Sequence, residues 1–393
     1  MKIGIDIRSL TDPQLTGVGT YTRAIVRAMQ QVAPDLQFSL YASGTREQTL
    51  TDLGIPNLAN TSLTWNRRPN KLLSARSTLT RAPYLDRIVG GVDVWFSPNV
   101  NFTALSPHVP HVLTVHDVSY ALYPDFFSLK RRLWHNATRA RRLIQQATHV
   151  ICDSRSTAQD VTRLYAIPAE QLTVVPLGAS LAEPPTPDES AAAQKKYELP
   201  KRYIVAIGAI EPRKNLAALV RAFDGVAQRD PDLGLALIGP LGWKTATFER
   251  AVAQSPVADR ILVLGYVPES AKRALLAGAT ALYCASSYEG FGLPALEALQ
   301  LGVPVLTANI SSLPEVTGHA AVLVDPERPV EIERALELLL SEPGLRTQLA
   351  DAGLPRAQGF SWHRAARQTV AVLRAVAEQG VGVQPVPVAA EVL

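Results

Sequence analysis

Short apolar runs rich in β-branched residues alternate with longer segments of helical periodicity along the whole chain. In the first half these runs are Lys2–Arg8, Gln37–Ala42, Asp93–Pro98, His111–His116, His149–Asp153 and Leu172–Pro176. In the second half they are Tyr203–Gly208, Leu235–Gly239, Ile261–Gly265, Ala281–Ala285, Val303–Thr307 and Ala321–Val324. Apolar strands of this length between helices are typical of parallel sheets covered on both faces. The sequence therefore predicts an α/β protein with two Rossmann-like domains.

The segments between these strands predict helices. Those with helical periodicity are Thr20–Val32, Leu129–Gln146, Asn215–Gln228, Thr245–Gln254, Glu269–Ala277, Pro294–Gln300 and Val330–Leu340. The stretch Ser180–Glu189 is rich in proline and acid without periodicity, which indicates a linker. The predicted domains are therefore residues 1–180 and 190–358, followed by a last helix at about 362–379 and a flexible tail, 380–393.

Length and composition agree with this division. A chain of 393 residues, 47% hydrophobic, suits two packed domains. Two cysteines, Cys152 and Cys284, lie in apolar runs and are expected to be core residues in a reducing compartment. No apolar run approaches the ~20 residues that span a bilayer, and the start of the chain does not resemble a signal peptide. We expect a cytoplasmic protein.

Charge is distributed unevenly. Residues 1–180 hold 19 Lys and Arg against 12 Asp and Glu, whereas the remainder holds 20 against 23. The excess lies in Asn66–Arg87 and Lys130–Arg142, where Leu129, Leu133 and Trp134 interleave with the cations. Either this is an ordinary solvated helix face, or it is an amphipathic contact with an anionic membrane at the inner face of the plasma membrane. No recognisable nucleic-acid module accompanies it, so nucleic acid is the least favoured partner.

The segment Glu289–Glu297, EGFGLPALE, follows a predicted strand and opens a helix. Gly290 and Gly292 let a ligand approach the backbone, and the N–H groups of Gly292 and Leu293 can bind a phosphate. Glu297 is placed to accept hydrogen bonds from a diol such as ribose, and Glu289 to bind a sugar. The alternative is a strand–loop–helix turn with two solvated glutamates.

A second motif, Gly208–Asn215, follows another predicted strand with the sequence GAIEPRKN. Arg213 and Lys214 are adjacent cations that can neutralise a departing diphosphate, or they are a surface pair.

Two motifs in the first half are weaker. His116 ends a strand in TVHD, where it can donate to a hexose hydroxyl or serve only a structural role. No nucleophile lies beside it in the sequence. Asp117 either orients His116 or binds the acceptor. Gly17 and Gly19, in TGVGT, can admit phosphate or acceptor before a helix.

Together these motifs resemble the retaining glycosyltransferases of family four, over about residues 1–375. The spacing of Glu289 and Glu297 is similar to the E-x7-E signature of that family, which has the GT-B fold. The resemblance implies two Rossmann-like domains facing across a cleft, with the C-terminal helix crossing back to the first domain. It also implies that the first domain binds the acceptor and the second a nucleotide-sugar donor.

The resemblance assigns roles to individual residues. Glu289 and His116 contact the donor sugar, Glu297 the ribose, and Arg213 and Lys214 the diphosphate. Lys214 is the firmer of the two cations, because Ala209 stands where some relatives have arginine. The implied catalytic residues are His116, Arg213, Lys214 and Glu289, and Asp117 is the acceptor-side residue. The implied donor-binding set also includes Gly17, Gly19, Gly208, Gly290, Phe291, Gly292, Leu293 and Glu297. Ser311–Glu315 resembles a segment near the donor site, or is a helix-capping turn.

The predicted activity is transfer of a hexose, with GDP-mannose the favoured donor, to a glycan or lipid-linked acceptor in polysaccharide biosynthesis. The family implies retention at the anomeric carbon. No cluster of Asp, His or Cys resembles a metal cage, so we expect no cofactor and no obligatory metal. Two alternatives remain: a sugar-nucleotide epimerase of similar fold, and a catalytically silent sugar-nucleotide-binding protein.

Overall fold

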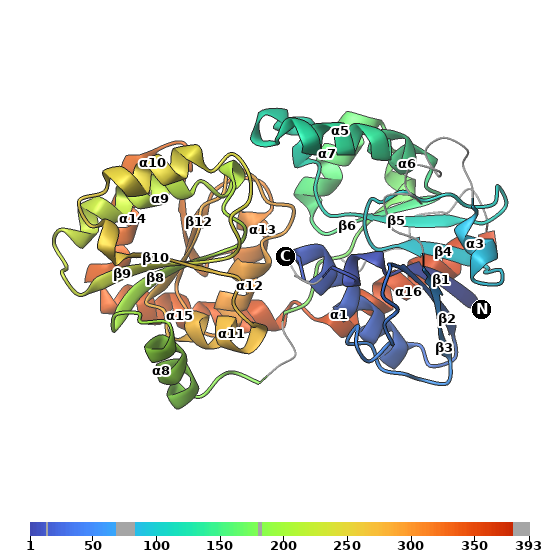
Figure 1. The fold of residues 1–393 in the computed structure, drawn as a ribbon, viewed down its shortest axis with the longest axis horizontal. Coiled ribbons are helices and arrows are strands. Elements are labelled where there is room, and N and C mark those ends of the chain that lie inside the picture. Colours follow the sequence, from blue (N-terminus) through green and yellow to red (C-terminus); the bar gives the residue numbers. More distant parts are fainter. Residues whose placement is uncertain (13–14, 68–82, 180–182, 380–393) are drawn as a thin grey trace. The chain divides into compact units, whose positions relative to one another are not determined.

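The computed structural model describes residues 1–12, 15–67, 83–179 and 183–379. These residues form two compact units, each built around one parallel sheet (Figure 1). The first unit comprises Met1–Val118, Leu129–Gly178 and the chain from Ser361, and the second comprises Ser119–Ser128 and Ala179–Phe360. The predicted tail, 380–393, and most of the basic segment Asn66–Arg87 lie outside the described residues.

The first unit contains a seven-stranded sheet in the order β3-β2-β1-β4-β5-β6-β7, in which every neighbouring pair is parallel. The strands are β1 Lys2–Asp6, β2 Gln37–Ser43, β3 Thr61–Asn66, β4 Val94–Ser97, β5 His111–Val115, β6 His149–Cys152 and β7 Leu172–Val174. The helices are η1 Arg8–Leu10, α1 Gly17–Val32, α3 Leu85–Ile88, α5 Leu129–Thr138, α6 Ala140–Gln146, α7 Arg155–Tyr165, η3 Ala169–Gln171 and α16 Trp362–Gln379.

The second unit contains a six-stranded parallel sheet in the order β10-β9-β8-β11-β12-β13. The strands are β8 Arg202–Ile207, β9 Leu233–Ile238, β10 Ile261–Gly265, β11 Ala281–Cys284, β12 Val305–Ala308 and β13 Ala321–Val324. The main helices are α4 Ser119–Leu122, α8 Pro187–Lys196, α9 Leu216–Ala227, α10 Ala246–Gln254, α11 Glu269–Ala277, α12 Leu293–Gln300, α13 Leu313–Thr317, α14 Pro329–Ser341 and α15 Pro343–Gln358. Three short 3₁₀ turns complete it: η2 Pro124–Phe126, η4 Pro212–Lys214 and η5 Ala258–Arg260.

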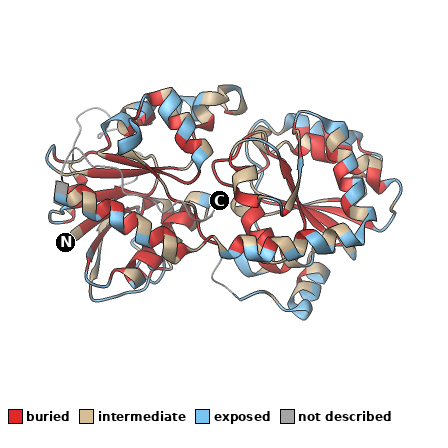
Figure 2. Cartoon of the chain, turned by 180° about the vertical axis from the view of Figure 1, so that it is seen from behind, coloured by how far each residue is buried: buried red, intermediate tan, exposed pale blue. Residues whose placement is uncertain are grey.

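Both sheets have the Rossmann order, in which the chain reverses its direction of growth between two central strands. In the second unit these strands are β8 and β11. Both are buried nearly throughout, and helices cover the two faces of the sheet, α9, α10 and α14 on one side and α11, α12 and α15 on the other (Figures 1 and 2). The predicted α/β fold with two Rossmann-like sheets is confirmed.

The helices α7 and α15 are not among the predicted helices. The structure also differs from the predicted segmentation at three places that have a local explanation. A helix, α8, begins at Pro187 inside the predicted linker, because Thr186 and Glu189 form a capping box at its start. The predicted helix Leu129–Gln146 is broken at Arg139, which adopts a left-handed conformation. The strand β3, a partly exposed edge strand, was not predicted, because TSLTWN lacks a continuous apolar run.

The segment Ser119–Ser128 belongs to the second unit, although the sequence placed it in the first domain. Its aromatic residues explain the difference. Phe127 stacks on Trp243 with ring centroids 5.9 Å apart, and Trp243 Nε1 donates to the carbonyl of Phe126 at 2.7 Å. Tyr123 packs against Tyr288 at 5.7 Å. These contacts bury apolar rings that a polar surface loop would leave in water.

The last helix, α16, packs on α1 in the first unit. Trp362 lies 5.9 Å from the ring of Tyr21, and Arg374 forms an ion pair with Asp35. The chain therefore leaves the first unit after Gly178 and returns to it at Ser361.

Candidate functional site

Two loops at the carboxyl ends of β8 and β11 carry the predicted donor residues of the second unit. One loop runs from Gly208 to Asn215 and contains η4, and the other runs from Ser286 to Gly292 before α12. Because β8 and β11 are neighbours at the point where the strand order reverses, their loops flank the crevice where α/β sheets bind ligands. Ser287 N donates to the carbonyl of Arg213 at 2.8 Å, which joins the two loops.

The carboxylate of Glu289 lies between the two predicted cations. Lys214 Nζ is 2.6 Å from Oε1 and Arg213 Nη1 is 2.7 Å from Oε2. Ser286 Oγ also donates to Oε1 at 2.7 Å. Burial by itself would raise the pKa of Glu289, but the two cations and these hydrogen bonds lower it to about 2. Glu289 is therefore ionised and fixed in position at neutral pH.

Arg213 has a second acidic partner that the sequence motifs did not indicate. Its Nε and Nη2 donate to Glu211 Oε1 at 3.1 and 2.7 Å, and its Nη1 also donates to the carbonyl of Tyr288 at 2.9 Å. Arg213 thus bridges the two loops. An arginine fork used in this way fixes the geometry of both.

Lys214 is held more simply, and Gly208 makes room for it. Glu289 is the hydrogen-bond partner of its ammonium group within the described chain, and an ammonium group has three donors. Gly208 has φ +135°, and a Cβ atom there would lie 2.9 Å from Lys214 Cε. A side chain at Gly208 would therefore displace Lys214.

Two serines hold the loop Glu289–Gly292 in place through hydrogen bonds to its backbone. Ser311 Oγ accepts from Glu289 N at 3.0 Å, and Ser312 Oγ lies 2.9 Å from the carbonyls of both Glu289 and Phe291. Ser312 occupies the N-cap position of α13, but its side chain makes no capping hydrogen bond to that helix. Gly292, with φ +103°, is the last residue before α12, and a Cβ atom there would lie 2.8 Å from Leu313 Cδ2.

Glu297 lies one turn into α12 and has its own cation. Lys272 on α11 approaches Glu297 at 3.1 Å and Glu269 at 3.0 Å. Burial raises the pKa of Glu297, and the charge of Lys272 opposes that rise. Lys272 was not predicted, because nothing in the α11 sequence marks it as different from a solvated helical lysine.

The predicted residues of the first unit surround His116, at the end of β5. Its Nδ1 lies 2.6 Å from Asp153 Oδ2 and its Nε2 lies 2.8 Å from the carbonyl of Pro98. Burial by itself would lower the pKa of His116, but the carboxylate of Asp153 and the two hydrogen bonds outweigh it, so the pKa is raised. A contact of His116 with a sugar hydroxyl requires one of these two partners to be exchanged.

The orienting partner of His116 is thus Asp153, 37 residues away, rather than the adjacent Asp117. Asp117 is half-buried beside His116 and adds to the negative potential around the imidazole. Gly17 and Gly19 lie inside the first turn of α1, not in a loop before it, because the Thr16 hydroxyl caps Gly19 N. The N–H groups of this first turn have no partner further back along the helix.

Within the described residues, no group of three His, Cys, Asp or Glu side chains is placed to hold a metal ion. No helix in the same part of the chain is long and apolar enough to cross a membrane.

Comparison with known proteins follows the same two-part division. The model described as Glycosyltransferase Family 4 matches residues 15–183, and the model described as Glycosyl transferases group 1 matches residues 188–354. The O-antigen chain mannosyltransferase B of Escherichia coli is 32% identical over 274 residues, which cover 67% of this chain and 71% of that protein. This chain belongs to glycosyltransferase family four. It is therefore an enzyme of the hexosyltransferase class, and the predicted family is confirmed.

Other similarities agree. The MMP alpha-(1->4)-mannosyltransferase of Mycolicibacterium hassiacum is 32% identical over 62% of this chain and 58% of that protein. Among solved structures, the sucrose-phosphate synthase of Thermosynechococcus elongatus has a TM-score of 0.74 at 19% identity, covering 95% of this chain and 98% of that one. Anabaena HepE, solved with UDP and glucose, has a TM-score of 0.72 at 18% identity, covering 95% and 100%. At such identities these structures support the GT-B type of fold alone.

Proposed function

We propose that this glycosyltransferase moves mannose from GDP-mannose to a hydroxyl group of a glycan or lipid-linked acceptor. The observation that carries the proposal is the carboxylate of Glu289 held between Arg213 and Lys214 at the carboxyl ends of β8 and β11. This site offers a fixed hydrogen-bond acceptor for a sugar beside cations for a diphosphate. The mannosyltransferases among the relatives support mannose as the sugar.

In this proposal Glu289 accepts hydrogen bonds from hexose hydroxyls, and Lys214 uses its remaining donors on the diphosphate. The backbone N–H groups of Gly292 and Leu293, at the start of α12, add hydrogen bonds and the positive end of the helix dipole. Glu297 accepts from the ribose hydroxyls, and the charge of Lys272 opposes the rise that burial causes in the pKa of this carboxyl group. Gly208, Gly290 and Phe291 shape the loops around the donor.

The chemistry requires no protein nucleophile. The acceptor oxygen attacks the anomeric carbon while the bond from that carbon to the diphosphate breaks. The acceptor proton passes to an oxygen of the leaving phosphate, so attack occurs on the same face and configuration is retained. Arg213 and Lys214 stabilise the charge that develops on the leaving group, which is the role that a metal ion has in other enzymes. We therefore propose that activity needs no metal, so that a chelator leaves it unchanged.

Donor binding is tested by thermal unfolding in a panel of nucleotide sugars, because a ligand that binds only the folded protein raises the melting temperature. GDP-mannose is expected to give the largest rise, and Lys214→Ala to abolish it. Lys201 precedes the same strand that Lys214 follows and is exposed, so Lys201→Ala is the matched control and should keep the full rise. A rise of equal size in Lys214→Ala would contradict the proposed phosphate site.

Turnover tests the remaining roles. Replacing Glu289, Lys214 or His116 by alanine should lower transfer by orders of magnitude while the protein still folds. Full activity in all three variants would show that the site is assigned wrongly. Product analysis separates the classes of activity, because an epimerase converts the nucleotide sugar without consuming an acceptor and a silent binding protein leaves it unchanged. Loss of activity in a chelator, restored by a divalent ion, would refute metal independence.

We also propose that α5 places the first unit on an anionic membrane. Its described surface exposes Leu129, Leu133 and Trp134 beside Lys130, Arg131 and Arg132. Such a face combines apolar insertion with attraction to acidic headgroups. Flotation with liposomes containing anionic lipid should carry the protein at low salt, and a failure to float under those conditions would refute the contact.

A further inference from the structure

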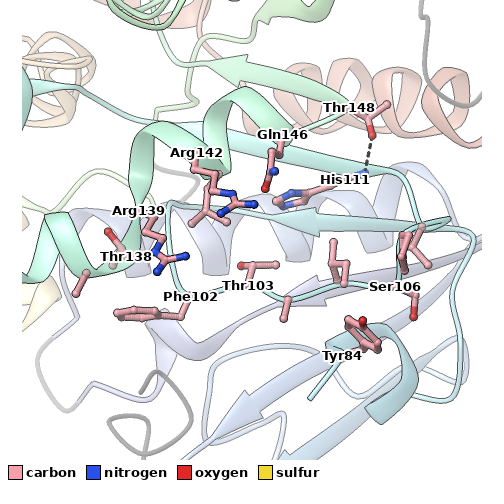
Figure 3. A pocket seen from close by; sticks show the side chains of 16 residues that line it. Tyr84, Phe102, Thr103, Ser106, His111, Thr138, Arg139, Arg142, Gln146 and Thr148 are labelled. Carbon is pink, nitrogen blue, oxygen red and sulfur yellow. Dashed lines mark hydrogen bonds between the residues drawn. The ribbon is translucent and has the colours of Figure 1, made fainter. Parts of the chain in front are cut away.

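A cavity of about 530 Å³ lies in the first unit, whereas both loops of the proposed donor site belong to the second. It lies between α6 and the connection from β4 to β5, residues 98–110, which contains no helix (Figure 3). A crossover between parallel strands usually carries a helix that covers the sheet. Here its absence leaves a space of the size typical for small-molecule sites, roughly 300–1,000 Å³.

The walls of this cavity differ in character. Phe102, Leu105, Val109 and Leu143 supply apolar surface. Arg139 and Arg142 extend their guanidinium groups into the space opposite Phe102 and Thr103 (Figure 3). The lining residues include no aspartate or glutamate, so the field inside is positive.

The two guanidinium groups are available to a ligand. Neither has a side-chain hydrogen bond or an ion pair within the described residues, whereas Arg213 is paired with Glu211 and Arg8 with Asp6. Arg139 also has φ +51°, an unusual conformation for a non-glycine residue, at the break between α5 and α6. The break between the two helices therefore falls at a residue that lines the cavity.

His111 adds a polar group to the cavity but no charge. Its Nε2 lies 2.9 Å from Ser97 Oγ, and burial lowers its pKa to about 4, so the ring is neutral at physiological pH. The positive charge of the cavity thus comes from Arg139 and Arg142 alone.

The apolar wall continues onto an exposed apolar surface. Phe102 meets Trp134 of α5 edge to face, with ring centroids 6.2 Å apart. Trp134 is 45% exposed, and Leu133 and Leu129 on the same helix are 59% and 72% exposed. Isolated exposed leucines are ordinary, but a run that leads into a cationic cavity indicates an amphiphilic ligand.

We propose that this cavity binds the phosphate of a phosphorylated lipid between Arg139 and Arg142, with the start of the hydrocarbon chain along Phe102, Leu105 and Leu143. Arginine forks match phosphate oxygens bidentately, and the apolar wall removes the chain from water. The chain leaves past Trp134. This site is separate from the donor site, and its existence does not depend on which sugar is transferred.

Farnesyl phosphate, kept at concentrations where it is monomeric, tests the proposal by isothermal titration calorimetry without any membrane. Farnesol lacks the phosphate and inorganic phosphate lacks the chain, so each should bind at least tenfold more weakly. Inorganic phosphate binding as tightly as farnesyl phosphate would show a simple anion site. Farnesol binding equally tightly would show an apolar site, and either result would overturn the proposal.

Variants locate the binding. Arg142→Gln and Arg139→Gln should each weaken farnesyl phosphate binding at least tenfold, with unchanged thermal unfolding. Arg141→Gln is the matched control, because Arg141 is exposed on the same helix and does not line the cavity. It should bind as the unmodified protein does. Unchanged affinity in Arg139→Gln/Arg142→Gln, or no binding of farnesyl phosphate to the unmodified protein, would refute the site.

Discussion

The carboxylate of Glu289 is held by three side chains of the protein and still has a lone pair for a further hydrogen bond. It accepts from Lys214, Arg213 and Ser286. Such an arrangement preorganises the acceptor, since no side-chain entropy is lost when a sugar binds. It also makes the residue a determinant of folding stability, because removing one partner of a buried ion pair leaves the other uncompensated.

The stability conferred by Glu289 should depend on pH. Its pKa is about 2 in the folded protein, below the unfolded value of about 4.5, so the stabilisation is full above pH 4.5 and is lost as pH falls toward 2. Glu289→Gln should cost roughly 3 kcal/mol at pH 7. Urea unfolding measures the difference in the free energy of unfolding between this variant and the unmodified protein. That difference should become smaller below pH 4.5. Glu327→Gln, at an exposed carboxylate, should show little difference at any pH. A difference for Glu289→Gln that grows as the pH falls would contradict a stabilising role for the ionised Glu289.

Asp153 is expected to control the protonation of His116. In Asp153→Asn the attraction of the carboxylate is lost while burial remains, so the pKa of His116 should fall. Stability from the protonated ring is present at low pH and lost as pH rises through the folded pKa, so that transition should move to lower pH. Titration of the His116 ring resonances by NMR measures the pKa of His116. Asp160→Asn, whose side chain pairs with Arg163, should leave the titration unchanged. An unmoved His116 midpoint in Asp153→Asn would exclude the coupling.

Residue types were predictable where a motif carried them. Glu289, Arg213 and Lys214 were each marked by glycine-bounded loops after apolar strands, and the structure brings these three together. Glu211, Lys272 and Asp153 were not marked. The partners of Lys272 and Asp153 come from other elements, so only the folded sheet reveals those pairs. Glu211 lies in the same loop as its partner Arg213, but nothing in the motif indicates that the two side chains meet.

At the scale of elements, the start of α13 holds the neighbouring loop, Glu289–Gly292, in position. Ser312 is fully buried, and its hydroxyl lies within hydrogen-bonding distance of two carbonyls of the Glu289 loop. The segment Ser311–Glu315 thus positions a loop of the proposed donor site without being part of the Glu289–Glu297 motif.

Ser312→Ala should lower stability by about 1–3 kcal/mol, because it leaves buried carbonyls without a donor. It should also raise the KM for the donor more than it lowers kcat, since the loop loses its position. Thermal unfolding and steady-state kinetics measure the two effects. Thr317→Val removes a buried hydroxyl on the same helix that donates to the carbonyl of Leu313 and not to the Glu289 loop, so it should leave KM unchanged. Equal KM values for both variants would show that Ser312 does not position the loop.

Elements with strong periodicity were predicted well, and elements defined by tertiary contacts were not. The strands β8, β9 and β11 of the second unit are continuous apolar runs, so burial on both faces is evident in the sequence itself. The strand β3 lies at the edge of the described sheet, where it pairs with β2 and is partly exposed, which leaves a mixed pattern. The break at Arg139 was invisible, because helical periodicity continues through it.

At the scale of the whole molecule, the chain passes between the two units twice, after Gly178 and before Ser361. These two crossing segments lie side by side. Ala179 N donates to the carbonyl of Phe360 at 3.2 Å within the second unit, and Gly178 packs against Trp362 within the first. A Cβ atom at Gly178 would lie 2.2 Å from Trp362 N, so only glycine fits there.

Gly178→Ala should therefore force the two crossing segments apart and destabilise the protein by roughly 1–3 kcal/mol. The measurement is the melting temperature, with activity as a second readout. Gly344→Ala is the matched control, because nothing lies within 4 Å of a Cβ atom at that position. It should melt at the same temperature or slightly higher. An unchanged melting temperature in Gly178→Ala would mean that the crossings tolerate separation.

The placement of Ser119–Ser128 bears on how family members can exchange parts. A chimera joined in the linker near residue 185 would take the second unit from one enzyme and leave this decapeptide to the other. The rings that should cover Trp243 and Tyr288 would then come from the wrong parent. Tyr288 directly precedes Glu289, so the mismatch would reach the donor loop. A donor-swapped enzyme should be built from three inherited pieces, with Ser119–Ser128 transplanted together with residues 179–360.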